Sequence, residues 1–187
     1  MKNSISAFII LIILITKCYG QYDKNGIVIN GGINFSNYLG QGEGNNYFKN
    51  ETPGFQLEFA AISGDGFELI IWGVSYYKGY NYAENNKLPV TFWTPYYTEF
   101  SFHQRNKKNP LFCFLGYDYV RMKFPNMEKP DSQHNITFGG GWNLKLTNQL
   151  FLQFKLKPYF IIDNSIGQWF GINSMVNLHF GIPQKTD

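Results

Sequence analysis

The side chains that could carry out chemistry are few in this chain. Ser101 and His103 are separated by one residue, so a β-strand would present both on one face, where a histidine can activate a serine nucleophile for ester hydrolysis. His179 and Ser174 have opposite parity and cannot meet on a strand, and His134 has no acid and serine partner nearby. The chain also has no phosphate-binding loop, no glycine-rich fingerprint and no cysteine or histidine pair at metal spacing. We therefore expect no cofactor, no metal and no catalytic residue.

A second set of chemically active residues consists of charges that alternate with apolar residues. In the stretch 149–162, QLFLQFKLKPYFII, the lysines fall on one parity and most of the leucines and phenylalanines on the other. Carboxylates and lysines of this kind, present in comparable numbers, can neutralise one another if they share an interior. The predicted polar network comprises Glu58, Glu99, Asp118, Lys145, Lys155 and Lys157.

The elements that must position these residues are strands, because the apolar residues recur at every second position. The pattern predicts eight strands, at 27–36, 54–62, 67–80, 90–103, 111–122, 136–146, 149–162 and 170–182. The segment 67–80 is apolar on both parities, which indicates a bulge or a change of register. Aromatic residues make up 19% of the chain, and this richness is typical of β proteins.

The connections alternate between short and long. Ser63–Gly66 and Thr147–Gln149 have the composition of tight turns, whereas Asn37–Pro53 is a long, glycine-containing loop. In an up-and-down arrangement the short turns collect at one end and the long loops at the other. Outer-membrane β-barrels are built in this way, with the short turns in the periplasm.

The N-terminal residues 1–20 have the features of a cleaved secretory signal, with a lysine, a short apolar run and a polar end at Gly20. We expect a mature β domain over 21–187. Cleavage removes two of the 16 basic residues and none of the 13 acidic ones, which leaves a net charge of about +1 and no electrostatic support for nucleic-acid binding. Cys113 is then the only cysteine, so no intrachain disulfide is expected.

Alternation alone fits either a soluble sandwich or a membrane barrel. Long strands, their even number and aromatic residues at strand ends favour the barrel. We therefore predict an all-β fold, an eight-stranded antiparallel up-and-down transmembrane β-barrel. A barrel of this size is only wide enough for side chains to fill, so the charges would plug it.

Four short motifs resemble the PorT-type outer-membrane β-barrel family common in Bacteroidota: Gly31–Ser36, Tyr76–Gly79, Leu88–Val90 and Val176–Ile182. The resemblance covers nearly the whole mature chain. It implies an outer-membrane barrel, and the family mostly lacks an assigned activity.

From these patterns we expect a small non-enzymatic outer-membrane protein that contacts membrane lipid and acts through extracellular loops or within an envelope assembly. Tyr38, Tyr47 and Phe48 in the first long loop are the candidate contacts for an envelope partner. Two alternatives are open: a lipid-modifying hydrolase in the outer membrane, and a soluble periplasmic β-barrel or sandwich that acts as a carrier.

Overall fold

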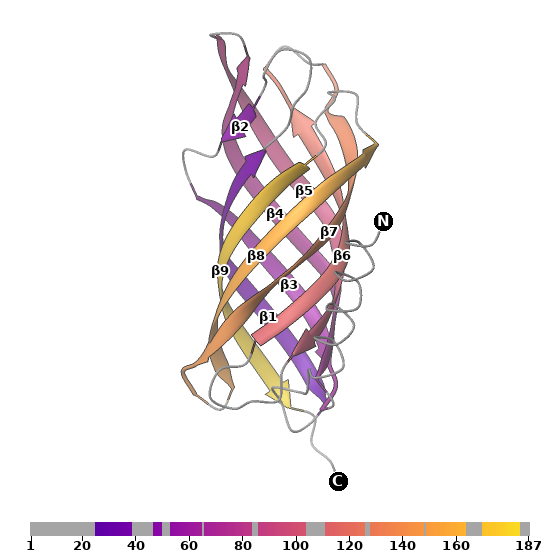
Figure 1. Ribbon diagram of the computed structural model, residues 1–187, viewed down its shortest axis with the longest axis vertical. Coiled ribbons are helices and arrows are strands. Elements are labelled where there is room, and N and C mark those ends of the chain that lie inside the picture. The colour runs from indigo at the N-terminus through magenta and orange to yellow at the C-terminus, as the bar shows by residue number, and fades with distance from the viewer. Residues whose placement is uncertain are drawn as a thin grey trace, which may run out of the picture.

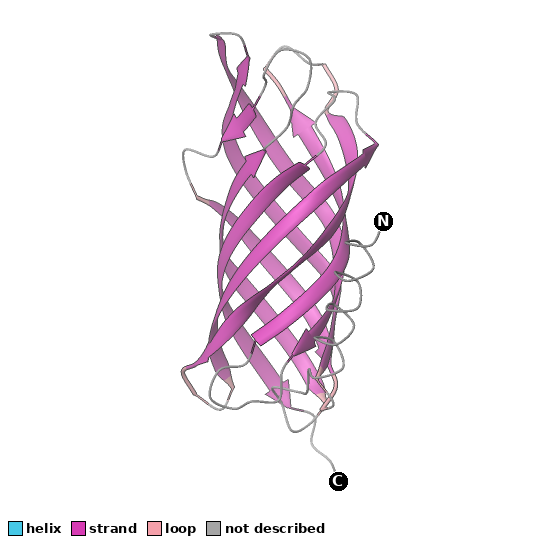
Figure 2. Ribbon diagram, viewed as in Figure 1, coloured by secondary structure: helices cyan, strands magenta, loops and turns pink. Residues whose placement is uncertain are grey.

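The chain forms a β structure (Figures 1 and 2) in a computed structural model that describes residues 25–38, 47–49, 53–64, 66–83, 86–103, 111–125, 128–147, 149–163 and 170–183. The predicted signal at 1–20 lies outside these residues. The strands are β1 (Gly26–Tyr38), β2 (Tyr47–Lys49), β3 (Gly54–Ile62), β4 (Phe67–Ala83), β5 (Asn86–His103), β6 (Leu111–Lys123), β7 (Asp131–Lys145), β8 (Leu150–Asp163) and β9 (Phe170–Pro183). Within the described residues, no helix has the length and apolarity to cross a bilayer.

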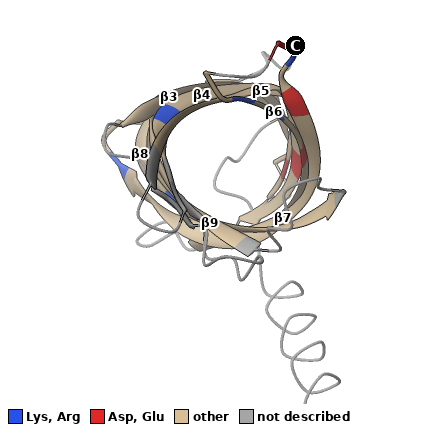
Figure 3. Cartoon of the chain, turned by 90° about the horizontal axis from the view of Figure 1, so that it is seen from above, with Lys and Arg blue, Asp and Glu red and all other residues tan. Residues whose placement is uncertain are grey.

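The long strands close into a barrel. From β3 to β9 each strand pairs antiparallel with its neighbour along the chain, and β1 pairs with β3 on one side. On the other side β1 pairs with β9 along its whole length, from Gly26 opposite Pro183 to Tyr38 opposite Gly171. Viewed from above, the strands form a complete ring (Figure 3). The predicted eight-stranded antiparallel up-and-down barrel is therefore confirmed, and closure removes the open sheet edges.

One element departs from the prediction of a long first loop. The short strand β2 pairs with β1 through Asn37 and Lys49 and with β4 through Tyr47 and Tyr82. β2 therefore takes the place of β3 between β1 and β4, beyond the point where β3 begins at Gly54. Both neighbours extend past that point, and their backbone N–H and C=O groups there need hydrogen-bond partners. Tyr38 ends β1, and Tyr47 and Phe48 belong to β2, so their backbones are strand and not free loop.

Two irregularities change which residues face outward. In β4 the register shifts between Ile70 and Gly73, and both Ile71 and Trp72 are exposed, which confirms the irregularity predicted for 67–80. In β5 the register shifts between Trp93 and Tyr96, around Pro95, which has no N–H to donate to the ladder.

The shift in β5 corrects a prediction about its faces. The alternating pattern places Val90 and Phe92 on the same outer face as Tyr96 and Phe100, but both residues are buried inside the barrel. Trp93 is exposed in their place. A bulge changes the phase of a strand by one residue, and the period-two pattern does not register that change.

Burial in the barrel is opposite to that of a soluble protein. The outer wall is apolar along every long strand, with Leu115 and Ile162 each 60% exposed. The inward positions carry buried polar and charged side chains, including Glu58, Glu99 and Lys157. An apolar wall of this extent is stable where lipid covers it, and the closed ladder satisfies the backbone groups that lipid cannot.

The two ends of the barrel differ. At one end β3 and β4 are joined by a tight turn, in which the Ser63 N–H donates to the Phe67 carbonyl at 2.8 Å, and β7 and β8 are joined by another around Thr147. At the other end β4 and β5, with 17 and 18 residues, continue their pairing up to Ala83 opposite Asn86. This hairpin stands above the rest of the barrel in Figure 1.

Candidate functional site

The centre of the lumen contains a buried network of charges. Lys155 on β8 forms ion pairs with Glu99 on β5 and with Glu58 on β3, the latter with 3.4 Å between Nζ and Oε1. Lys157 lies 3.4 Å from Glu99 and 2.8 Å from Asp118 on β6. Four strands thus contribute side chains that cross the barrel and meet near its axis.

Neutral groups complete this network. The Tyr97 hydroxyl donates to Glu58 Oε1 at 2.7 Å, and the Asn30 amide donates to Glu58 Oε2 at 2.7 Å. The ammonium groups also lie against aromatic rings, with Lys157 Nζ 4.3 Å from the ring centre of Tyr97. Charges removed from water in this way are tolerated because each one has a partner of opposite sign or a hydrogen bond.

The structure brings together five of the six residues predicted for the polar network. Glu58, Glu99, Asp118, Lys155 and Lys157 lie within one connected set of ion pairs. Lys145 is exposed and takes no part in it. It has the inward parity of Asn143, but it is the last residue of β7, beside the short turn, where the barrel interior ends.

Towards the long-loop end, the lumen contains an apolar cluster beside buried polar residues such as Ser36 and Gln133, the latter directly opposite Val120. A cluster of buried residues comes from β4, β5, β6 and β8, in which the Tyr77 and Phe92 rings stack with their centres 4.9 Å apart. Its members are Tyr77, Val90, Phe92, Val120, Met122, Tyr159 and Ile161. The sequence pattern predicts only polar filling, so this apolar layer is an unpredicted part of the plug.

Towards the short-turn end, the filling consists of amides, histidines and a carboxylate. His103 Nε2 lies 2.7 Å from Glu68 Oε2, and the His103 ring stacks on Phe112. From Gln153, near the start of β8, a chain of amides runs along the wall. The Asn177 amide donates to Gln153 Oε1 at 3.0 Å, and the Gln56 amide, on the long-loop side of Glu58 in β3, donates to Asn177 Oδ1 at 2.7 Å. Val28, Ala60, Ile62 and Ile70 form part of a second buried apolar cluster, which also includes Tyr97.

Glycines in β7 make room for this filling. A Cβ at Gly141 would lie 2.7 Å from the Phe112 ring, and one at Gly139 would lie 3.0 Å from the Phe114 ring. Phe112 and Phe114 therefore occupy space that side chains on β7 would otherwise need. The two phenylalanines fall on the polar parity of β6, and the glycines opposite them, Gly141 and Gly139, are the signal in the sequence for their inward position.

The serine and histidine considered for hydrolysis lie inside the barrel wall. Ser101 and His103 are both buried on β5 near the short-turn end, and the His103 ring faces Glu68 and Asn143. Among the described residues Ser101 makes no hydrogen bond to His103, and no group of three His, Cys, Asp or Glu side chains there is arranged to hold a metal.

No protein-family model matches this chain. No curated protein matches it either. Solved structures with the same fold include Neisserial surface protein A (NspA), at 10% identity and a TM-score of 0.61 over 84% of this chain and 97% of that one. They also include Ail, the attachment invasion locus protein of Yersinia pestis, in complex with the heparin analogue sucrose octasulfate, at 12% identity and a TM-score of 0.55 over 85% and 99%. OprG, an outer membrane protein of Pseudomonas aeruginosa, has 8% identity and a TM-score of 0.54 over 88% and 100%. The fold is therefore the one found in small outer-membrane barrels.

Proposed function

We propose that this protein is an integral outer-membrane β-barrel that does not conduct solutes, has no catalytic centre, and acts through the rim formed by its long strands and loops. The observation that carries the proposal is the reversed burial: an apolar wall outside, and an interior that holds buried charged, polar and apolar side chains. A soluble carrier needs an apolar cavity for its cargo and a polar surface, and this barrel has the opposite arrangement.

The filled lumen argues against a pore. An apolar cluster with buried polar neighbours occupies the long-loop end, ion pairs occupy the centre, and histidines with amides occupy the short-turn end. A hydrated ion that entered this path would have to displace buried side chains, and at the centre it would have to separate ion pairs. Eight-stranded barrels have interiors that side chains can fill in this way.

The burial of Ser101 and His103 argues against the hydrolase alternative. An enzyme that modifies lipid needs its serine within reach of the ester, and both residues point into the packed interior. The remaining place for a biological contact is the outer rim, where binding residues on a rigid barrel usually lie.

At that rim we retain Tyr38, Tyr47 and Phe48 as the proposed contacts to an envelope partner. They now belong to β1 and β2, so a partner would meet them on a stiff sheet extension. Membership in the PorT-type family, export through the predicted signal at 1–20, and a role in an envelope assembly belong to the same proposal.

The test has two parts. Purified protein reconstituted in planar bilayers should give no stable single-channel conductance. When cells are fractionated, the protein should stay in the outer-membrane fraction after that fraction is washed with carbonate. In parallel, a photo-crosslinking amino acid at Tyr47 or Phe48 should capture an envelope protein on intact cells. The matched position is Thr147, in the exposed turn at the opposite end. Steady conductance, or recovery in the soluble fraction, would refute the proposal. Capture at Thr147 and not at the rim would place the contact at the wrong end.

A further inference from the structure

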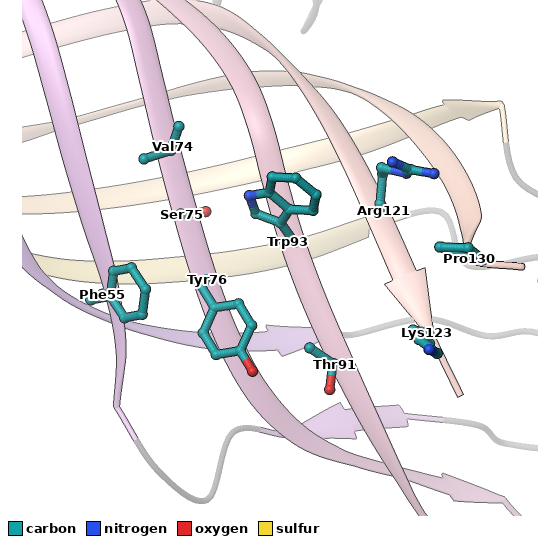
Figure 4. Close-up of a pocket in the computed structure, with 9 residues that line it drawn as sticks. All are labelled: Phe55, Val74, Ser75, Tyr76, Thr91, Trp93, Arg121, Lys123 and Pro130. Atoms are coloured by element: carbon teal, nitrogen blue, oxygen red, sulfur yellow. The ribbon is translucent and has the colours of Figure 1, made fainter. Parts of the chain in front are cut away.

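The outer wall carries a groove near the long-loop end. It is a cavity of about 270 Å³ between β3, β4, β5 and β6, lined among others by Phe55, Tyr76, Trp93, Arg121 and Lys123 (Figure 4). The groove lies beside an irregular part of the wall, because just after Trp93 the register of β5 shifts against both of its neighbours, β4 and β6. Figure 4 shows Trp93 between Tyr76 and Arg121.

The residues of the groove are arranged in two rows across the strands. In the first row Phe55, Tyr76, Trp93 and Arg121 lie directly opposite one another on four neighbouring strands, and the Phe55 and Tyr76 rings stack at 5.4 Å. In the second row Lys78, Thr91 and Lys123 lie directly opposite one another on β4, β5 and β6; Thr91 and Lys123 line the groove, and Lys78 lies outside its lining. Since β4 and β6 both run towards the long-loop end, the row with two lysines is the one nearer that end.

This order matches the layers of a membrane interface. Aromatic rings sit at the boundary between hydrocarbon and headgroups, and cations lie beyond them at the level of the headgroups. Lys78 and Lys123 are exposed and Arg121 is partly buried. Among the described residues, none of the three cations has an ion-pair partner. Three positive charges around an apolar groove therefore lack an anion.

We propose that this groove binds a phosphate-bearing lipid of the outer leaflet. Arg121, Lys78 and Lys123 contact the phosphate, and an acyl chain packs along Phe55, Tyr76 and Trp93. Arginine suits this role because its planar fork can donate two hydrogen bonds to one phosphate. The inference rests on the proposed function, because it requires the apolar wall to lie in lipid.

The test uses two tryptophans as local reporters. Trp93 borders the groove and is 48% exposed, while Trp142 lies on β7 near the short-turn end and is 51% exposed. Two variants each retain one of them, with every other tryptophan replaced by phenylalanine. Both variants are reconstituted in vesicles of unlabelled phosphatidylcholine that contain a minor fraction of one brominated lipid. This lipid is phosphatidic acid, diacylglycerol or phosphatidylcholine, in each case with bromine on the acyl chains. Bromine quenches a tryptophan on contact, so quenching measures the local concentration of each lipid.

We expect brominated phosphatidic acid to quench Trp93 with a relative association constant at least about tenfold above that at Trp142, because each nearby cation contributes about fivefold. Brominated diacylglycerol, which lacks the phosphate, should show no such preference. The substitutions Lys78→Gln, Arg121→Gln and Lys123→Gln together should remove the preference. The matched control Lys145→Gln, an exposed lysine at the opposite end, should leave the association constant measured at Trp93 unchanged.

The outcomes separate this inference from the proposed function. If brominated phosphatidylcholine quenches both tryptophans but phosphatidic acid shows no preference for Trp93, the barrel is in the membrane and the lipid site is wrong. If the preference survives loss of the three cations, the phosphate is not held by them and the proposal is also wrong. If brominated phosphatidylcholine quenches neither tryptophan, the membrane placement itself fails.

Discussion

Replacing Lys155 with methionine should cost much of the stability of the barrel. Among the described residues, Lys155 is the only ammonium group that pairs with Glu58, and it shares Glu99 with Lys157. Both carboxylates are almost fully buried, with side chains 1% and 0% exposed. Methionine keeps most of the volume of the lysine stem but leaves two buried negative charges with fewer partners. Removal of one partner from a buried ion pair typically costs about 3–5 kcal/mol, and we expect a loss in this range.

The measurement is the free energy of unfolding in urea, with the protein reconstituted in phosphatidylcholine vesicles and followed by tryptophan fluorescence. The second variant combines Lys155→Met with Glu99→Gln, which removes one positive and one negative charge and keeps the formal charge of the network. It should recover about half of the loss, because Glu99 then carries no charge and Lys157 can serve Asp118 alone, while Glu58 keeps only its hydrogen bonds from Tyr97 and Asn30. The control is Leu156→Met, at a neighbouring outward position that is 51% exposed, and it should change stability by less than about 1 kcal/mol.

Two results would refute this reasoning. If Lys155→Met costs no more than Leu156→Met, the ion pairs do not stabilise the folded barrel and the lumen tolerates unpaired carboxylates. If Glu99→Gln adds to the loss and does not offset it, charge balance is not the reason for the effect.

Four further outcomes are expected. Val176→Arg, on the apolar wall, should lower the free energy of unfolding in vesicles by about 2–4 kcal/mol, whereas Leu146→Arg beside the short turn should cost about 0–1 kcal/mol; equal losses would contradict the membrane placement. Gly73→Ala should cost about 1–3 kcal/mol in the same urea titration, because the added methyl group would overlap the Tyr97 ring and displace it from Glu58. Deletion of Leu39–Phe48 should leave the heat-modifiable folded form on gels but lower the midpoint of urea unfolding, because it removes most of β2 from its pairing with β4; an unchanged midpoint would show that this pairing adds nothing. Replacing Phe92 and Met122 together with alanine should thin the apolar layer of the lumen and produce measurable ion leakage in planar bilayers, and a barrel that stays silent would show that the central charges seal it alone.

The sequence predicts the barrel well because one physical rule, alternation between lipid and lumen, applies along most strands. Ile136, Phe138 and Trp142 are exposed as the alternation predicts, and so are Leu178 and Phe180 on β9. The rule fails where the backbone leaves the regular pleat. Val90 and Phe92 face inward because the bulge around Pro95 shifts the phase of β5, and only the proline indicates that shift in the sequence.

Other features depend on the position of a residue along the barrel axis. Lys145 has the correct parity for the lumen but lies beyond its end, and alternation gives no measure of height. Tyr47 and Phe48 form a strand because their backbone pairs with the part of β4 that extends past β3. A strand of three residues is too short to show a period in the sequence. Tyr97 joins the charge network through contacts with β3 and β8 that are distant in the sequence.

The unequal length of the strands sets how far above the lipid surface a binding partner can contact the protein. At about 3.3 Å per residue and a tilt of about 40°, the 18 residues of β5 extend about 45 Å along the barrel axis, compared with an apolar band of about 25 Å. β4 and β5 stay paired up to Ala83 and Asn86. The part of these strands that extends beyond the apolar band is therefore a two-stranded antiparallel hairpin. A molecule that binds its tip is held at a fixed distance from the lipid surface, clear of short headgroups. Lengthening or shortening both strands by pairs of residues would raise or lower that point of contact in steps, without altering the sealed interior below it.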